Sequence, residues 1–135
     1  MKKYELTDSI RVCRLDPDNP VTLYRIRALR DFGSVKTGDF GGFVAREDNL
    51  SHDGNCWVSD ESMVFGKALV MDDAQLRDHA MAYGYAVIYE NAVLSGYAKA
   101  FGEADISGDM HYDSGWIIHH VGDLSGEFTS NMVIP

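Results

Sequence analysis

Residues 62–108 decide the fold, and they read SMVFGKALVMDDAQLRDHAMAYGYAVIYENAVLSGYAKAFGEADISG. A small residue stands at every sixth position of this stretch, first Ser62 and then seven alanines. Valine, leucine, isoleucine or alanine follows two positions after each of them, and glycine, aspartate or glutamate follows two positions later again. Six residues of an α-helix turn through about 600°, so this spacing does not stay on one helical face. The repeat indicates short strands rather than helices.

Each hexad is typical of a short strand followed by a corner. Residues two apart lie on the same side of a strand, so the small and aliphatic series face one interior. Glycine and aspartate tolerate the backbone angles that a corner requires. Strands this short must stack on the next turn of a coil, and three hexads make a triangular coil of about 18 residues. The sequence therefore predicts an all-β fold, a parallel β-helix of about three to four coils.

Two stretches of the chain resemble known proteins. The hexads of residues 56–114 resemble the hexapeptide-repeat family, whose fold is a left-handed parallel β-helix. Residues 23–58, LYRIRALRDFGSVKTGDFGGFVAREDNLSHDGNCWV, resemble the leader of small hexapeptide-repeat proteins of phages and prophages. The resemblance implies the left hand of the coil, which the spacing alone does not give. Members of the family are often named acyltransferases, so acyl transfer is one function that the resemblance implies.

The segments on either side of the repeat predict a cap and a final coil. We expect residues 1–43 to form an N-terminal β cap, because the open end of a coil exposes backbone that must be covered. We expect residues 44–135 to form the solenoid, including a C-terminal coil. The expected strands outside the repeat are residues 3–9, 10–15, 21–30 and 116–121, and the expected turns are residues 33–42.

Charge is distributed unevenly along the chain. The 135 residues carry a net charge of −9, from 12 Lys and Arg against 21 Asp and Glu. Residues 1–46 hold nine basic and six acidic side chains (+3), and residues 47–135 hold three basic and fifteen acidic ones (−12). Affinity for a phosphate backbone comes from Lys and Arg, so we expect no direct binding of nucleic acid.

The absence of a signal peptide and of a membrane span indicates the compartment, and the two cysteines indicate the redox state of the thiols. The start, MKKYELTDSI, has no apolar run of a signal peptide, and no stretch approaches the roughly 18 apolar residues of a membrane span. We therefore expect a cytoplasmic protein that does not contact membranes. Cys13 and Cys56 are the two cysteines. Since two cysteines make neither a disulfide framework nor a zinc site alone, we expect buried free thiols.

Histidine is the residue type to examine for acyl transfer, because the resemblance implies a catalytic histidine near a subunit interface. If the chain is an acyltransferase with an active site between subunits, His79 beside Asp78 is its catalytic residue; the alternative is a solvated corner histidine. His119 and His120 point to opposite faces of a strand, so with His111 they do not converge on a metal. We expect no metal and no cofactor. The remaining histidine is His52.

One outward face of the predicted coil is unusually apolar. Residues one coil apart stack in columns, and the second of the three faces combines methionines with aromatic rings where polar residues are usual. Such patches mark contact sites, so we predict that this face binds a protein partner or a second copy of the chain. The alternatives are an aromatic ladder that only stabilises the solenoid, or a surface that the cap covers. The predicted partner-binding residues are Met63, Phe65, Met81, Tyr83 and Phe101.

One corner of the coil carries an acidic ridge, which consists of Asp72, Asp73, Glu90 and Asp109. A column of carboxylates on a rigid rod has the spacing to imitate a nucleic-acid backbone and so inhibit a host nucleic-acid-binding factor. The alternative is that acidic corners keep a repetitive β protein in solution with its edges unpaired. The sequence favours a non-catalytic binding protein of phage or prophage origin, with the hexapeptide-repeat acyltransferase as the alternative function.

Overall fold

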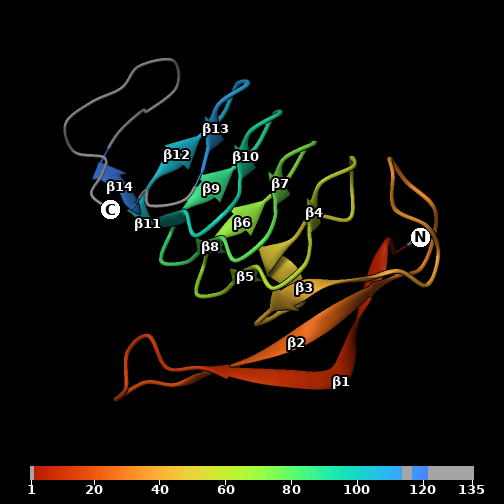
Figure 1. The fold of residues 1–135 in the computed structure, drawn as a ribbon, viewed down its shortest axis with the longest axis horizontal. Helices are drawn as coiled ribbons and strands as arrows, with labels where there is room; N and C mark the ends of the chain where they lie inside the picture. The colour runs from red at the N-terminus through yellow and green to blue at the C-terminus, as the bar shows by residue number, and fades with distance from the viewer. Residues whose placement is uncertain (1, 114–116, 122–135) are drawn as a thin grey trace.

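The computed structural model describes residues 2–113 and 117–121, and it confirms an all-β parallel solenoid with antiparallel strands at its N-terminus (Figure 1). Short strands stack in register along three faces. The elements are β1 (Tyr4–Cys13), β2 (Val21–Ala28), β3 (Phe40–Val44), the 3-10 helix η1 (Glu47–Asn49), β4 (Trp57–Val58), β5 (Met63–Val64), β6 (Leu69–Val70), β7 (Gln75–Leu76), β8 (Met81–Ala82), β9 (Val87–Ile88), β10 (Val93–Leu94), β11 (Lys99–Glu103), β12 (Asp105–Ile106), β13 (His111–Tyr112) and β14 (Ile117–Val121). The first face holds β4, β7, β10 and β13, the second β3, β5, β8, β11 and β14, and the third β6, β9 and β12.

The strand register confirms the predicted coil length. On the first face, Trp57 pairs with Gln75, Gln75 with Val93, and Val93 with His111. Each step along this column is 18 residues, the same separation at which the carboxylate of Asp60 accepts the N–H of Asp78. The hand of the coil stays an expectation from the family resemblance. β14 confirms a strand within residues 116–121, and the last part of the predicted C-terminal coil lies outside the described residues.

The interior is filled as the hexads predict. The seven alanines of the repeat are at most 1% exposed, and so are the aliphatic residues that follow them from Val64 to Ile106. Ser62 begins the small series with a hydroxyl, which donates to the carbonyl oxygen of Ser59. A narrow column of small and branched side chains therefore forms a continuous core, as close packing of a thin prism requires.

The corners adopt left-handed backbone angles. Asp60, Asp72, Asp78 and Glu90 have φ between 56° and 59°, a region that Asp tolerates better than most residues and that Gly enters freely. Gly84 shows why glycine is needed at some corners: its φ is 70°, and a Cβ there would lie 2.9 Å from the backbone nitrogen of Gly102. The prediction that Gly, Asp and Glu turn the corners is confirmed.

The N-terminal segment differs in detail from its prediction. Residues 3–9 and 10–15, expected as two strands, belong mainly to the single strand β1, whose pairing with β2 is irregular between Leu6 and Ile10. The expected turns of residues 33–42 end in β3, which pairs antiparallel with β2 and parallel with β5. The one strand β3 thus joins the antiparallel hairpin to the first coil.

The first coil is longer than the coils that follow it. Phe43 pairs with Met63 and Leu50 bridges to Val70, and both steps are two residues longer than the step from Trp57 to Gln75. The regular step holds from Cys56 onward. The two additional residues therefore lie between Leu50 and Cys56, in the corner that carries His52 and its polar partners.

The β1–β2 hairpin runs along the solenoid and covers part of the second face (Figure 1). Leu23 and Cys13 are buried there against Phe65 and Met81. Arg11 and Arg25 both pair with Glu61, the latter at 3.0 Å. The hydrogen bond from Arg11 contributes most to lowering the pKa of Glu61 below its usual value. No helix in the described part of the chain is long and apolar enough to cross a membrane.

Candidate functional site

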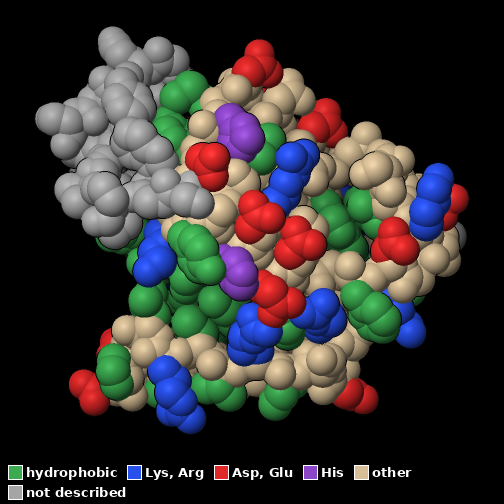
Figure 2. All heavy atoms as spheres, in the orientation of Figure 1, with side chains coloured by type: hydrophobic (Ala, Val, Ile, Leu, Met, Phe, Trp, Pro, Cys, Tyr) green, Lys and Arg blue, Asp and Glu red, His purple; other side chains and the backbone are tan. Residues whose placement is uncertain are grey.

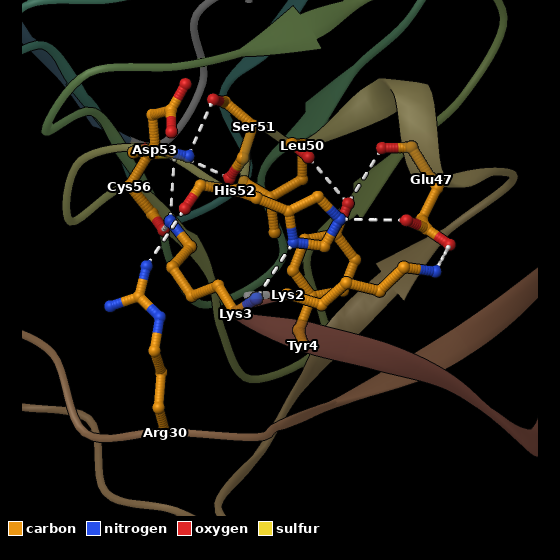
Figure 3. Close-up of polar contacts among 10 residues, drawn as sticks. All are labelled: Lys2, Lys3, Tyr4, Arg30, Glu47, Leu50, Ser51, His52, Asp53 and Cys56. Atoms are coloured by element: carbon orange, nitrogen blue, oxygen red, sulfur yellow. Dashed lines mark hydrogen bonds and ion pairs between the residues drawn. The ribbon is translucent and has the colours of Figure 1, made fainter.

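A polar cluster ties the start of β1 to the first coil (Figure 3). Lys3 is fully buried, and its Nζ donates to the carbonyl oxygens of Cys56 (2.8 Å) and Gly54 (3.3 Å). The Sγ of Cys56 lies 3.4 Å from the same Nζ. Burial lowers the pKa of Lys3, and burial raises the pKa of the Cys56 thiol. A thiol of raised pKa in a closed environment is a poor nucleophile, so this pair has the properties of a structural anchor.

His52 completes the cluster and has no free nitrogen. Its Nδ1 accepts the backbone N–H of Lys3 (3.0 Å), and its Nε2 faces Glu47 Oε2 at 2.8 Å. The ring of Tyr4 stacks on the imidazole with centroids 4.3 Å apart, and the Tyr4 hydroxyl donates to the carbonyl oxygens of Glu47 and Leu50. The hydrogen bond from His52 lowers the pKa of Glu47, and burial raises the pKa of Tyr4. Since both ring nitrogens are occupied, His52 is not available as a base.

His79 lies at the corner between the first and second faces. Its ring is exposed and stacks on that of Tyr97, one coil further on, with centroids 4.8 Å apart and planes at 5°. Within residues 2–113, neither ring nitrogen of His79 makes a hydrogen bond or ion pair. The face of the molecule in Figure 2 shows histidine side chains among acidic and basic ones. The Asp78 carboxylate does not orient His79, because it accepts the backbone N–H of Gly96 (2.9 Å) instead.

His111, His119 and His120 were not expected to converge on a metal, and of their side chains the structure describes that of His111. His111 is exposed, and its Nε2 lies 2.9 Å from Ser95 Oγ. The side chains of His119 and His120 lie outside the described part of the structure. Among the described side chains, no group of three His, Cys, Asp or Glu residues gathers to hold a metal.

The five predicted partner-binding residues do not share one environment. Phe65 and Met81 are each 7% exposed because the hairpin packs on them. Met63, Tyr83 and Phe101 remain half-buried. The rings of Phe65, Tyr83 and Phe101 stack at centroid distances of 5.0 and 5.2 Å. The aromatic ladder and the cover by the cap, both given above as alternatives, are therefore present, and the partly exposed end of this face is at Tyr83 and Phe101.

The acidic ridge is partly occupied by backbone hydrogen bonds. Asp72 Oδ2 accepts the N–H of Glu90 (3.0 Å), and Glu90 Oε1 accepts the N–H of Gly108 (2.8 Å). Asp73 Oδ1 accepts the N–H of Asn55 (3.1 Å). Asp109 is exposed. On the face shown in Figure 2, acidic side chains lie close to one another with Lys and Arg beside them. Asp72, Asp73 and Glu90 therefore join one coil to the next, and no finding supports a phage origin or imitation of nucleic acid.

A shallow hollow lies on the hairpin, away from the histidines of the solenoid. It encloses about 420 Å³ and is wide open to solvent. Glu5, Leu6, Thr7, Asp8, Ser9, Arg27 and Phe40 line it. The carboxylate of Glu5 pairs with Arg27 across the hollow. Glu5 and Arg27 offset each other's charge, and most of the lining belongs to the irregular part of β1, so we attribute the hollow to the strand irregularity.

Sequence reasoning did not find the cluster around Lys3 and His52. The signal was present, since the hexad frame that runs from Cys56 does not continue upstream without two additional residues. The hydrogen bond between Ser95 and His111 was also missed. Ser95 and His111 are 16 residues apart, two fewer than one coil, so they occupy neighbouring outward positions on successive coils. This spacing is the sequence signal that could have identified the contact.

One curated relative is informative. The chain is similar to the protein of Escherichia coli strain K12 that is named "uncharacterized acetyltransferase YdcK". The two sequences are 34% identical over 80 residues, which correspond to 56% of this chain and 24% of YdcK. The chain spans about a quarter of the length of that relative. No protein-family model matches the chain.

Proposed function

We propose that the chain is an acyltransferase of the hexapeptide-repeat type, with His79 as general base in a cleft formed where two copies meet. The observation that carries this proposal is the similarity to YdcK, which is named an acetyltransferase. The solenoid fold is consistent with it. The proposal gives preference to the function that the sequence suggested as an alternative.

His79 suits the role better than the other described histidines. A general base needs an open nitrogen that reaches the proton it removes. His52 has both nitrogens occupied, and the Nε2 of His111 faces Ser95. The stack on Tyr97 fixes the plane of the His79 ring while leaving its edge open. In the proposed reaction, His79 takes a proton from an acceptor hydroxyl or amine as that group attacks a thioester carbonyl. The proton then passes to the departing thiolate.

A second copy is needed to enclose this reaction. The His79 corner borders the second face, where Tyr83, which packs against the hairpin cluster, and Phe101 are both half-buried. Docking of a second copy on these rings places a wall beside His79 and excludes water from it. This role keeps the predicted partner surface but limits it to the half-buried rings of Tyr83 and Phe101.

The test is acyl transfer from acetyl-CoA to a panel of amines and alcohols, followed as release of free CoA. We expect His79→Ala to lower the rate at least about 100-fold, the usual contribution of a general base. Asn91→Ala is the matched control, because Asn91 occupies the equivalent exposed corner position on the same coil. Transfer that survives in His79→Ala, or no transfer to any acceptor in the panel, would refute the proposal.

The assembly is tested separately by the mass in light scattering. We expect Tyr83→Ser with Phe101→Ser to reduce the mass to that of a single chain and to reduce CoA release in parallel. A single chain in the unmodified protein contradicts the intersubunit cleft.

A further inference from the structure

A serine and a histidine meet on the first face, apart from the His79 corner. Ser95 follows β10 and His111 opens β13, and their Oγ and Nε2 atoms are 2.9 Å apart. The backbone fixes this approach, because the Ser95 N–H donates to the carbonyl oxygen of Tyr112 (2.9 Å). Among residues 2–113, this is the one aliphatic hydroxyl bonded to an imidazole. A nucleophile and its base need this separation, about 2.6–3.2 Å.

A serine at this position of the coil does not always contact a histidine, as Ser59 shows. Ser59 occupies the same outward column two coils earlier, and its hydroxyl donates to the carbonyl oxygen of Leu76 (3.1 Å). The Ser95 hydroxyl faces an imidazole instead. Ser95 is buried at 8% exposure, whereas His111 is exposed, so the pair lies just beneath the surface with the histidine on its solvent side. The hydroxyl of Ser95 is thus held beside a group that is able to accept its proton.

A cation lies next to the pair in the same column. Arg77 is one coil before Ser95, and its backbone N–H donates to the carbonyl oxygen of Leu94 (2.8 Å). The Arg77 side chain is exposed, and none of the described side chains pairs with it. Successive coils are about 4.8 Å apart, so the guanidinium has the reach to approach an oxygen that becomes negative beside Ser95. Positive charge at that place stabilises the tetrahedral state of acyl transfer.

From this geometry we infer that Ser95 and His111 form a nucleophile–base pair that accepts the acyl group of an activated ester. His111 Nε2 takes the Ser95 proton while Oγ bonds to the carbonyl carbon. The carbon–oxygen bond to the leaving group then breaks, and the leaving group receives the proton from the imidazolium. The product is an ester on Ser95, which water cleaves in a second step by the same base. This pair goes beyond the proposed function, since it requires neither CoA nor His79.

The test uses a fluorophosphonate probe and p-nitrophenyl acetate on the full chain, with no CoA present. We expect one phosphonyl group per chain, with loss of fluoride, and peptide mapping that places it on Ser95. We also expect a burst of one p-nitrophenol per chain. Ser95→Ala should abolish both, and Ser59→Ala, the matched control from the same column, should leave both unchanged.

A variant of His111 tests whether this residue acts as a base or only supports the local structure. His111→Gln keeps a hydrogen-bonding side chain beside Ser95 but cannot take up its proton, so we expect labelling at least about 100-fold slower with unchanged urea unfolding. An unlabelled protein, label on another residue, or normal labelling of His111→Gln would overturn the inference. Labelling of Ser95 without CoA release from acetyl-CoA would support this pair while contradicting the proposed function alone.

Discussion

Asp72 and Asp109 belong to the same acidic ridge but differ in what their carboxylates contact. Asp72 has φ of 58° and its carboxylate accepts an N–H of the next coil, whereas the Asp109 carboxylate makes no hydrogen bond to another described residue. We expect Asp72→Ala to lower the free energy of unfolding by about 1–2 kcal/mol, because it removes a hydrogen bond and leaves an alanine in the left-handed region. Urea unfolding measures this change.

Two further variants show whether the hydrogen bond or the negative charge of Asp72 stabilises the corner. Asp72→Asn keeps an acceptor and tolerance of the left-handed region, so its unfolding midpoint should stay close to that of the unmodified protein. Asp109→Ala should change the free energy of unfolding by less than about 0.5 kcal/mol. Equal losses in Asp72→Ala and Asp72→Asn would show that the charge, rather than the hydrogen bond, matters at this corner.

The thiol of Cys56 makes stability depend on pH above neutrality. Burial raises its pKa above the ordinary 9.0. Above that pH the unfolded chain releases the thiol proton while the folded chain retains it, so the unfolded state is favoured. The stabilisation is complete below pH 9.0 and is lost as the pH rises toward the folded pKa. We therefore expect the stability difference between the unmodified protein and Cys56→Ala to shrink over this range.

Urea unfolding from about pH 7 to about pH 10 checks this expectation. Val58→Ala is the control, because it opens a cavity in the same core without removing a titrating group. Its stability difference from the unmodified protein should be the same at every pH. A constant difference for Cys56→Ala as well would mean that the thiol titrates alike in both states.

At the scale of elements, the β1–β2 hairpin packs on the second face through the apolar side chains of Leu23 and Cys13. Leu23 is fully buried against Phe65 and Met81. We expect Leu23→Ala to cost about 2–4 kcal/mol in urea unfolding, the usual range for a truncated core leucine. It should also increase binding of an apolar dye as the face opens. Ile10→Ala, on the same hairpin at 56% exposure, should do neither. Dye binding equal to that of Ile10→Ala would indicate that Leu23 does not hold the hairpin.

The solenoid could be predicted from the sequence in much more detail than the β1–β2 hairpin. The hexad repeat specifies strand, corner and interior at once, so coil length, the buried alanines and the left-handed Asp corners were all predictable. The path of the hairpin was not, because it depends on Leu23 meeting side chains that lie far away in sequence. His79 could be named from its corner position, but the Ser95–His111 contact needed the exact stacking of coils. The longer first coil before Cys56 hid the cluster around Lys3.

At the scale of the whole molecule, the step of 18 residues that holds from Cys56 onward makes the later coils interchangeable units. We expect a second copy of residues 87–104, inserted after Ala104, to fold as one more coil. Each coil contacts mainly its neighbours, so the insertion should increase the dependence of unfolding on urea concentration as more surface becomes buried. Inserting one residue fewer shifts every later side chain to the opposite face and should lose the strands that follow. Equal stability of the two insertions would contradict a fixed register.

The buried Lys3 has a consequence for the order of events during synthesis. Its principal acceptor is the carbonyl oxygen of Cys56, 53 residues later in the chain. A growing chain therefore carries its N-terminal strand without that acceptor until the first coil has left the ribosome. The hairpin waits longer still, since Met81 is among the side chains that cover Leu23. The hairpin is therefore made first and docks last, after Met81 of the second coil has been synthesised.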